Sequence, residues 1–468
     1  MQPGIITPPQ HAAAIAEAEA SLLLEAVLDA ARRAGADAAE AVLVAGRALE
    51  ARVRLGGLES LERDDSFAIG LRVFIDGRQA HVSTASRRMA ALRELAARAV
   101  AMARVSPPDP HAGLAPPDLL HADPSAGEER LALADGADPG PSVLEELARA
   151  AEEAARADPR ITNSGGAGAS AARARRWHAT TDGFFAAGES TSYGLWASVM
   201  AGAGDAGVRD YASHASRHLG DLESPEVVGT RARRRTLARL GARSAPTGRH
   251  PVLFEPRVAR TLVGHLAAAI NGERIARGTS FLKDALGEPV FAPDVAVIDD
   301  PLRPRGLRSR AFDAEGVATR RREIVRGGRL LTWLLDSATS RELGRQTTGH
   351  ACRSLAEPPS PAPANFYLAP GTRTPTELMR EAGRGLVVTE LIGQGVNLVT
   401  GDYSRGAAGF WFEDGEIAWP VHEITIAGHM KDMFRTLVPA DDLEFRYGID
   451  SPTLLIPEMT VAGRAEGA

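Results

Sequence analysis

Residues 67–84 decide the fold of the N-terminal part of the chain: FAIGLRVFI (67–75), the dipeptide Asp76-Gly77, and a return strand near Gln79–Thr84. An Asp-Gly dipeptide between two apolar runs is a strong hairpin signal, because both residues tolerate positive φ angles. Alternating runs at 41–44, 51–55 and 58–63 predict further strands. Amphipathic helices are predicted at about 12–35 and 86–104. The pattern therefore indicates an N-terminal α+β domain over residues 1–105, in which helices cover an antiparallel sheet.

The rest of the chain divides into three parts. Residues 106–140 begin with a stretch rich in Pro, Asp and Ala that predicts a linker. Residues 141–244 predict a central α+β region, with a helix opening at Pro141-Ser142 and a Glu at position 145 as in a capping box. In the same region we expect strands at 171–181, 190–201 and 208–218, and a helix at 224–241 that begins at Ser224-Pro225. Residues 245–468 predict a β-rich C-terminal domain with one helix at 256–271 and hairpin turns at 326–329 and 413–416.

Composition restricts the class of protein. The 468 residues are 44% hydrophobic and 24% charged, which is typical of a soluble globular protein of two or three domains. The start, MQPGIITPPQ, lacks the features of a secretory signal, and no apolar stretch reaches the roughly 18 residues of a membrane span. The single cysteine, Cys352, excludes an internal disulfide and fits a reducing compartment. We expect a cytoplasmic protein without a membrane partner.

The charge pattern gives no reason to expect nucleic-acid binding. There are 54 basic and 60 acidic residues, a net charge of −6. Nearly every basic residue is Arg, so the cluster at 231–235 predicts a solvated helix face. The glycine-rich segment 164–168 lacks the Lys and the strand-loop-helix context of a phosphate-binding loop.

Two C-terminal segments carry a family resemblance: ELIGQGVN at 390–397 and TGDYSRGAAGFW at 400–411. Together they resemble the PmbA/TldE branch of the TldD/PmbA family. Further agreement lies at 56–60, 70–73, 277–284, 312–316, 423–428 and 455–459. The resemblance implies a relation to zinc peptidases whose TldD branch has an H-E-x-x-x-H helix and a C-terminal Cys ligand. It also implies a TldD-type partner subunit, small or unfolded peptides as substrates, and an association with microcin maturation and DNA gyrase modulation.

The helix that matches H-E-x-x-x-H reads Arg260-Thr261-Leu262-Val263-Gly264-His265. A guanidinium cannot bind zinc, and Thr cannot act as the carboxylate base. The segment 448–452, where the family's Cys ligand falls, has no cysteine. We therefore expect no catalytic residue and no metal in this chain, with zinc in the TldD-type partner. His265 is interpreted as a packed histidine, or alternatively as a metal ligand whose co-ligands are not identified. Two His at this spacing would face one metal only in a distorted helix, which Gly264 would permit.

Residues 400–405 are the candidates for a peptide groove: Thr400, Gly401, Asp402, Tyr403, Ser404 and Arg405. Glycines let a backbone approach a ligand, and an extended peptide pairs with a free strand edge. The alternative is a structural role, in which Asp402 and Arg405 form an internal ion pair.

Other candidate pairs have weaker patterns. His350 and Cys352 are two residues apart, a poor geometry for a nucleophile pair. Asp299 and Asp300 are adjacent and point to opposite faces of a strand. The two histidines that flank 423–428, at 422 and 429, are expected at the surface.

Three functions remain open. The first is a non-catalytic subunit of a heteromeric zinc peptidase, and it agrees best with the resemblance and the missing ligands. The second is an independently active hydrolase, in which the chain pairs with itself and an unrecognised metal site uses His265. The third is a regulatory or binding protein that acts on gyrase or another partner without proteolysis.

Overall fold

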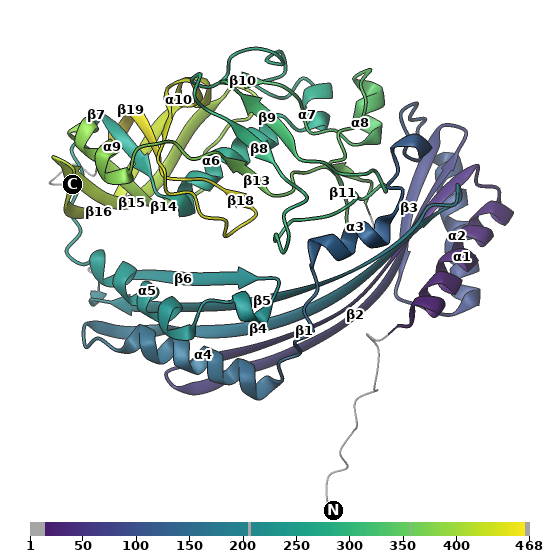
Figure 1. The fold of residues 1–468 in the computed structure, drawn as a ribbon, viewed down its shortest axis with the longest axis horizontal. Helices are drawn as coiled ribbons and strands as arrows, with labels where there is room; N and C mark the ends of the chain where they lie inside the picture. The colour runs from purple at the N-terminus through teal and green to yellow at the C-terminus, as the bar shows by residue number, and fades with distance from the viewer. Residues whose placement is uncertain (1–14, 205–206, 356, 464–468) are drawn as a thin grey trace, which may run out of the picture.

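We describe the protein from a computed structural model, in which residues 15–204, 207–355 and 357–463 are placed well enough to describe. A long curved antiparallel sheet supports helices on its outer face, and the C-terminal domain lies against its inner face (Figure 1). The fold is α+β, as predicted. The sequence start and residues 12–14 of the first predicted helix lie outside the described residues.

The curved sheet has six strands in the order β3-β2-β1-β4-β5-β6. These are β1 (Ala38–Arg54), β2 (Gly57–Ile75), β3 (Arg78–Thr84), β4 (Ile161–Thr180), β5 (Phe185–Ala201) and β6 (Val208–Ser216). All neighbouring strands are antiparallel, and β1 pairs with β4 over most of its length. The predicted N-terminal and central regions are therefore built on one continuous sheet.

The hairpin predicted at Asp76-Gly77 is confirmed, with φ angles of 46° and 66°. The runs predicted as separate strands merge: 41–44 and 51–55 belong to β1, and 58–63 and 67–75 belong to β2. Residues 60–66 are largely polar, but they remain in strand conformation because each pairs with a residue of β1, and Glu59 lies at a β-bulge. Leu55 and Gly56 form the turn between the two strands, again with positive φ angles of 51° and 78°.

Two pairs of helices cover the outer face of the sheet and bury two separate cores. The first pair, α1 (Glu17–Ala34) and α2 (Met89–Val105), packs on one end of β1 at Ala39, Ala41 and Leu43. The second pair, α4 (Pro141–Arg156) and α5 (Pro225–Ala238), packs on the other end at Ala51 and Val53. Odd-numbered residues of β1 thus face the helices, and even-numbered residues face the C-terminal domain.

The predicted helix starts have different outcomes. Ser224 caps α5, because its hydroxyl accepts a hydrogen bond from the Val227 amide at 3.4 Å, as expected. The capping box predicted for α4 is wrong. The N-cap residue is Gly140, so Ser142 already lies inside the first turn, and Glu145 pairs with Arg149 at 2.5 Å.

The segment predicted as a linker contains structure of its own. A 3-10 turn, η1 (Pro117–Leu119), precedes α3 (Pro124–Leu131), whose N-cap Asp123 accepts a bond from the Ala126 amide at 3.1 Å. Leu131 and Leu133 bury against Ala311, so this segment joins the C-terminal domain to the inner face of the sheet.

The C-terminal domain is built on a second sheet of order β16-β15-β14-β7-β19-β17. An additional pairing of β16 with β19 closes five of these strands into a ring. They are β7 (Gly248–Phe254), β14 (Arg384–Ile392), β15 (Asp402–Glu413), β16 (Glu416–His429), β17 (Val438–Pro439) and β19 (Leu454–Ala462). The predicted hairpin at 413–416 joins β15 to β16.

A third sheet, of order β10-β9-β8-β13-β18, packs beside the ring. Its strands are β8 (Val297–Asp299), β9 (Arg322–Arg326), β10 (Arg329–Leu330), β13 (Phe366–Leu368) and β18 (Ile449–Asp450), and the hairpin predicted at 326–329 joins β9 to β10. The remaining elements are β11 (Ala351–Cys352), β12 (Ser360–Pro361), η3 (Leu219–Asp221), α7 (Gly272–Ala276), α8 (Ser337–Glu342), α9 (Pro375–Ala382) and α10 (Met430–Thr436).

One helix, α6 (Pro256–Ala269), contacts strands of both C-terminal sheets. Its apolar face, with Leu262, Val263 and Leu266, lies in the largest hydrophobic core of the protein. None of the helices among the described residues has the length and apolar character needed to cross a membrane.

Candidate functional site

Helix α6 holds the three residues that the sequence assigned to a degenerate zinc site. It follows β7, with Glu255 at the N-cap and Pro256 in the first turn, and runs without interruption to Ala269. No distortion occurs at Gly264. Residues five apart on a regular helix project about 140° from each other. Arg260 and His265 accordingly point to different surroundings.

Arg260 points to the loop before β18. Its guanidinium carbon lies 4.4 Å from the centroid of the Tyr447 ring, a cation–π contact. Its Nε donates to the Arg257 carbonyl at 3.2 Å. Arg260 is thus held as a structural cation.

The segment 448–452 does approach α6, as the family pattern requires of a ligand-bearing segment. Its acidic side chain, Asp450, accepts backbone amide bonds from Arg446, Tyr447 and Gly448 at 2.9, 2.8 and 3.0 Å. Burial raises the pKa of Asp450, and those amide bonds and the charge of Arg260 only partly oppose the rise. The Asp450 carboxylate therefore stabilises its own loop by accepting these backbone hydrogen bonds.

Thr261 and His265 complete the degenerate site. The Thr261 hydroxyl donates to the Val258 carbonyl at 2.6 Å, within the helix. The His265 ring packs edge-on against Tyr403, with 6.4 Å between centroids. Burial, aided by the positive charge of Arg405, lowers the pKa of His265 to about 4, so the ring is neutral at pH 7.

A neutral imidazole is a competent zinc ligand, but His265 has no suitable neighbours. Across residues 15–204, 207–355 and 357–463, no group of three or more His, Cys, Asp or Glu side chains is arranged to hold a metal ion. A zinc ion therefore does not fit the donor set at 260–265.

The peptide-groove candidates lie around the start of β15, and their main chain is already paired on both sides. Residues 402–405 pair with 426–429 of β16. On the other side, the Ser404 amide donates to the Gly395 carbonyl at 2.7 Å and the Asn397 amide donates to the Asp402 carbonyl at 2.9 Å. A peptide cannot add to this strand as a further strand, so only side chains are available to contact one.

The internal ion pair considered for Asp402 and Arg405 is not formed, because the two side chains point to opposite faces of β15. Asp402 instead accepts a hydrogen bond from the Thr400 hydroxyl at 2.5 Å. Gly401 adopts a φ of 96° at the turn into the strand.

A cavity of about 710 Å³ opens where the inner face of β5 and β6 meets α6, β14 and β15. It brings together two of the predicted residues, Thr261 and Arg405, but not the others. The opposite wall consists of Trp196, Ser198, Tyr211 and Ser213. This cavity is the candidate functional site.

Most of the charge around this cavity is neutralised. Arg257 donates two hydrogen bonds to Asp210, at 2.6 and 3.2 Å. Arg239 pairs with Glu390 at 2.5 Å and with Asp210 at 3.7 Å. Burial alone would raise the pKa of Asp210. The bonds and charge of Arg257, the Tyr211 amide and the charge of Arg239 together outweigh burial and hold that pKa below its usual value. These ion pairs join β6 to the C-terminal domain.

The aromatic wall was not predicted from the sequence, and the signal that could have indicated it is the run of glycines opposite Trp196. The glycines at 164–168 do not form a phosphate loop. A β-bulge lies between Ser164 and Gly166, and a Cβ atom at Gly168 would stand 2.5 Å from Trp196 Nε1. The glycines therefore make room for the indole that lines the cavity.

The other sequence candidates do not form sites. His350 is buried, with its Nδ1 2.7 Å from the Thr348 hydroxyl and its Nε2 3.0 Å from Asp299, so it does not activate the exposed Cys352. Asp299 is buried and Asp300 is only partly buried, which agrees with side chains that point to opposite faces of the strand. His422 is exposed, and His429 caps α10 through a 3.3 Å bond from the Lys431 amide.

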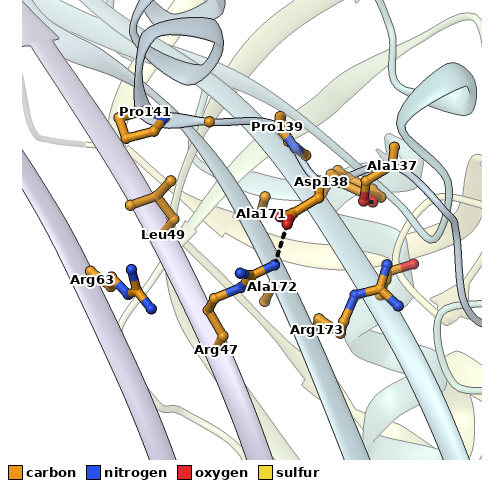
Figure 2. A pocket seen from close by; sticks show the side chains of 13 residues that line it. Arg47, Leu49, Arg63, Ala137, Asp138, Pro139, Pro141, Ala171, Ala172 and Arg173 are labelled. Atoms are coloured by element: carbon orange, nitrogen blue, oxygen red, sulfur yellow. Dashed lines mark hydrogen bonds and ion pairs between the residues drawn. The ribbon is translucent and has the colours of Figure 1, made fainter. Parts of the chain in front are cut away.

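A smaller cavity of about 190 Å³ lies on the outer face, next to the segment that leads into α4 (Figure 2). Figure 2 shows Arg47 and Asp138 pointing toward each other, and they pair at 2.6 Å. The neighbouring Arg63 pairs with Asp65 at 3.0 Å, and Arg173 pairs with Glu189. None of the predicted site residues lies here, and each of these cations already has a partner.

Comparison with known proteins identifies the class of protein. Three family models match in order: domain 1 of the PmbA/TldA metallopeptidases at 39–103, their central domain at 134–240 and their C-terminal domain at 247–463. The sheet, the α6 segment and the 400–411 motif are thus those of a metallopeptidase-type protein. The chain belongs to the PmbA/TldD family, which confirms the resemblance.

Relatives extend over nearly the whole chain. Metalloprotease PmbA of Escherichia coli O157:H7 is 38% identical over 452 residues, 96% of this chain and 98% of the relative. A PmbA homologue of Haemophilus influenzae is 37% identical over 463 residues, 97% of this chain and 99% of the relative.

Solved structures agree with this fold. A Bacteroides thetaiotaomicron protein, suggested to modulate DNA gyrase, superposes with a TM-score of 0.87 at 25% identity, covering 96% of this chain and all of that one. TldE of Thermococcus kodakarensis superposes with a TM-score of 0.83 at 20% identity, covering 94% of this chain and all of that one, a likeness of fold alone.

Proposed function

We propose that this chain is the PmbA/TldE-type subunit of a cytoplasmic TldD/TldE-type metallopeptidase complex that degrades or processes small or unfolded peptides. The proposed zinc site belongs to a TldD-type partner. The observation that carries the proposal is the chemistry of α6. Arg260 occupies the position of the first ligand and is stacked on Tyr447, while Thr261, at the position of the base, bonds within its own helix.

The segment 448–452, where the cysteine ligand would fall, also supports the absence of a zinc site from this chain. Asp450 belongs to the segment that would supply the cysteine, and it is engaged by three backbone amides. In this proposal the chain contributes substrate-contacting surface. The cavity between β5–β6 and α6 is the part of that surface with the volume and the side chains to hold part of a peptide.

Zinc content and peptide hydrolysis, measured on the same samples, test the proposal. Elemental analysis of the purified chain should find no stoichiometric zinc, and the chain alone should hydrolyse no peptide. A mixture with a TldD-type subunit should contain zinc and be active. Near-stoichiometric zinc together with activity in the lone chain would overturn the proposal.

A double variant sharpens the test. Arg260→His with Thr261→Glu restores two side chains of the H-E-x-x-x-H pattern, but it supplies no cysteine near Asp450. We expect this variant to remain inactive alone. A thermal unfolding curve close to that of the parent chain serves as the folding control, and hydrolysis by the variant would show that a third ligand exists elsewhere.

A further inference from the structure

Arg405 is an uncompensated positive charge at the wall of the large cavity. Its side chain is half-buried, and its Nε is enclosed without a hydrogen-bond partner. Within the described part of the chain it forms no ion pair, whereas Arg239 and Arg257 in the same cavity are paired with Asp210 and Glu390. The charge of Arg405 contributes to the lowered pKa of His265. A desolvated cation without a partner favours an anion beside it.

The position of Arg405 is fixed by close packing. A Cβ atom at Gly395 would stand 1.5 Å from the Ser404 carbonyl oxygen and 3.3 Å from Arg405 Cγ. The strand that bears Arg405 is paired on both sides and belongs to the closed ring. A binding group on a rigid element loses little conformational entropy when a ligand arrives.

The wall opposite Arg405 is aromatic. Trp196 and Tyr211 lie on the inner face of β5 and β6, and Tyr211 is 49% exposed. On the near side, Val258 and Leu391 add apolar surface.

Arg209 also lines the cavity without an ion pair to any described residue, but its side chain is exposed to solvent, whereas that of Arg405 is half-buried. The cavity thus combines a half-buried, unpaired guanidinium with apolar and aromatic surface, in a volume of about 710 Å³. Such a site matches a ligand with an anionic end and an apolar body.

We infer that this cavity binds a carboxylate of a peptide, with the Arg405 guanidinium as the carboxylate-binding group and with Trp196 and Tyr211 in contact with the adjacent apolar side chain. The inference rests on the proposed function for the choice of a peptide. A planar guanidinium matches the two oxygens of a carboxylate. The carboxylate is that of the peptide C-terminus or of an Asp or Glu side chain, and the test separates these sources.

The test uses the full chain without any partner subunit and measures fluorescence anisotropy. The probes are fluorescein-labelled hexapeptides of Ala, Leu and Phe, with a free or an amidated C-terminus, and an amidated version in which one residue is Glu or Gln. We expect at least one carboxylate peptide to bind on the order of tenfold more tightly than its neutral counterpart, as a charge-assisted hydrogen bond implies. Preference for the free C-terminus or for Glu identifies the source.

Two variants locate the interaction. Arg405→Gln should remove the preference for the carboxylate, while Arg405→Lys should restore part of it, because the charge returns without the planar fork. Arg209→Gln is the matched control. Arg209 is an exposed cation of the same cavity, so its substitution removes the same unit charge without removing the half-buried guanidinium.

Equal affinity for the carboxylate and neutral peptides would overturn the inference, as would equal effects of Arg405→Gln and Arg209→Gln. Thermal unfolding of each variant checks that the fold is retained. Failure here is distinguishable from failure of the proposed function, since the latter is decided by zinc and hydrolysis in the mixture with a TldD-type subunit.

Discussion

At the scale of single residues, Glu40 is a buried carboxylate held by two arginines and a histidine. It lies on the inner face of β1 and contacts Arg72 at 3.0 Å, His178 at 3.1 Å and Arg353 of the C-terminal domain at 2.6 Å. Burial alone would raise the pKa of Glu40. The nearby Arg353, His178 and Arg72 outweigh burial and hold the pKa well below 4.5. The carboxylate is therefore ionised in the folded protein.

We predict that Glu40→Gln destabilises the protein by about 3–5 kcal/mol, because two buried cations lose their counter-charge. Glu50→Gln, in the same strand but at a partly exposed pair with Arg52, should change stability by less than about 1 kcal/mol. Urea unfolding at pH 7 measures both. Equal effects of the two substitutions would contradict the role of Glu40 as the counter-charge of two buried arginines.

The stability difference between the parent chain and Glu40→Gln should also depend on pH. Since the pKa of Glu40 is lower in the folded than in the unfolded chain, its stabilisation is present above about pH 4.5 and is lost as the pH falls through the lower folded value. The difference in stability between the parent and Glu40→Gln should therefore shrink on acidification.

At the scale of elements, α6 is a regular helix although a metal site would demand a distorted one. Gly264 lies in its interior, and a Cβ atom added there would meet no atom within 4 Å. The glycine is required neither by packing nor by an unusual backbone angle.

We predict that Gly264→Ala stabilises the protein by about 0.5–1 kcal/mol through helix propensity. Gly409→Ala provides the contrast, since its Cβ would lie 1.9 Å from the Val387 carbonyl oxygen and would force β14 and β15 apart. Thermal melting should show opposite shifts. Destabilisation by Gly264→Ala would indicate a helix that departs from regular geometry.

Elements were predictable from sequence where local chemistry decides them. The Asp76-Gly77 hairpin, the Ser224 cap and the helix at 256–271 depend on residues close together in the chain. The long polar half of β2 was not predictable as one strand with 67–75, because its conformation comes from pairing with β1. The glycines around 401 suggested that the edge of β15 is free to bind a peptide. In the structure, main-chain bonds from the loop 393–401 occupy that edge.

At the scale of the whole molecule, the sheet and the C-terminal domain have separate hydrophobic cores and are joined largely by polar contacts. Glu40 with Arg353 joins them at one place, and Asp210 with Arg257 joins them at another. The candidate cavity lies beside the second junction. Its walls come from residues 196–213, 239–261 and 389–405, which are far apart in the chain, so no local pattern predicts it. Of the six peptide-groove candidates predicted from the sequence, only Arg405 lines this cavity, and its role in binding stays a prediction.

We predict that Asp210→Asn loosens the second junction. The substitution keeps the shape of the side chain but removes the charge that faces Arg257 and Arg239. Hydrogen exchange should accelerate in β6 and α6 together and remain unchanged in α1 and α2. Asp221→Asn is the matched control, since Asp221 pairs with Arg305 of the C-terminal domain at 2.9 Å but is well exposed. Faster exchange in β6 alone would argue against a junction that couples the curved sheet to the C-terminal domain.

The order of strands in the closed ring has a consequence for synthesis on the ribosome. The curved sheet uses no strand beyond residue 216, so it can form while the remainder is still being translated. Strand β7, made soon afterwards, lies between β14 and β19, and its last neighbour begins only at residue 454. The ring therefore cannot close until β19 (Leu454–Ala462) has been synthesised. A nascent chain stalled before residue 454 would display β7 with one unpaired edge, a template for aggregation that chaperones would have to cover.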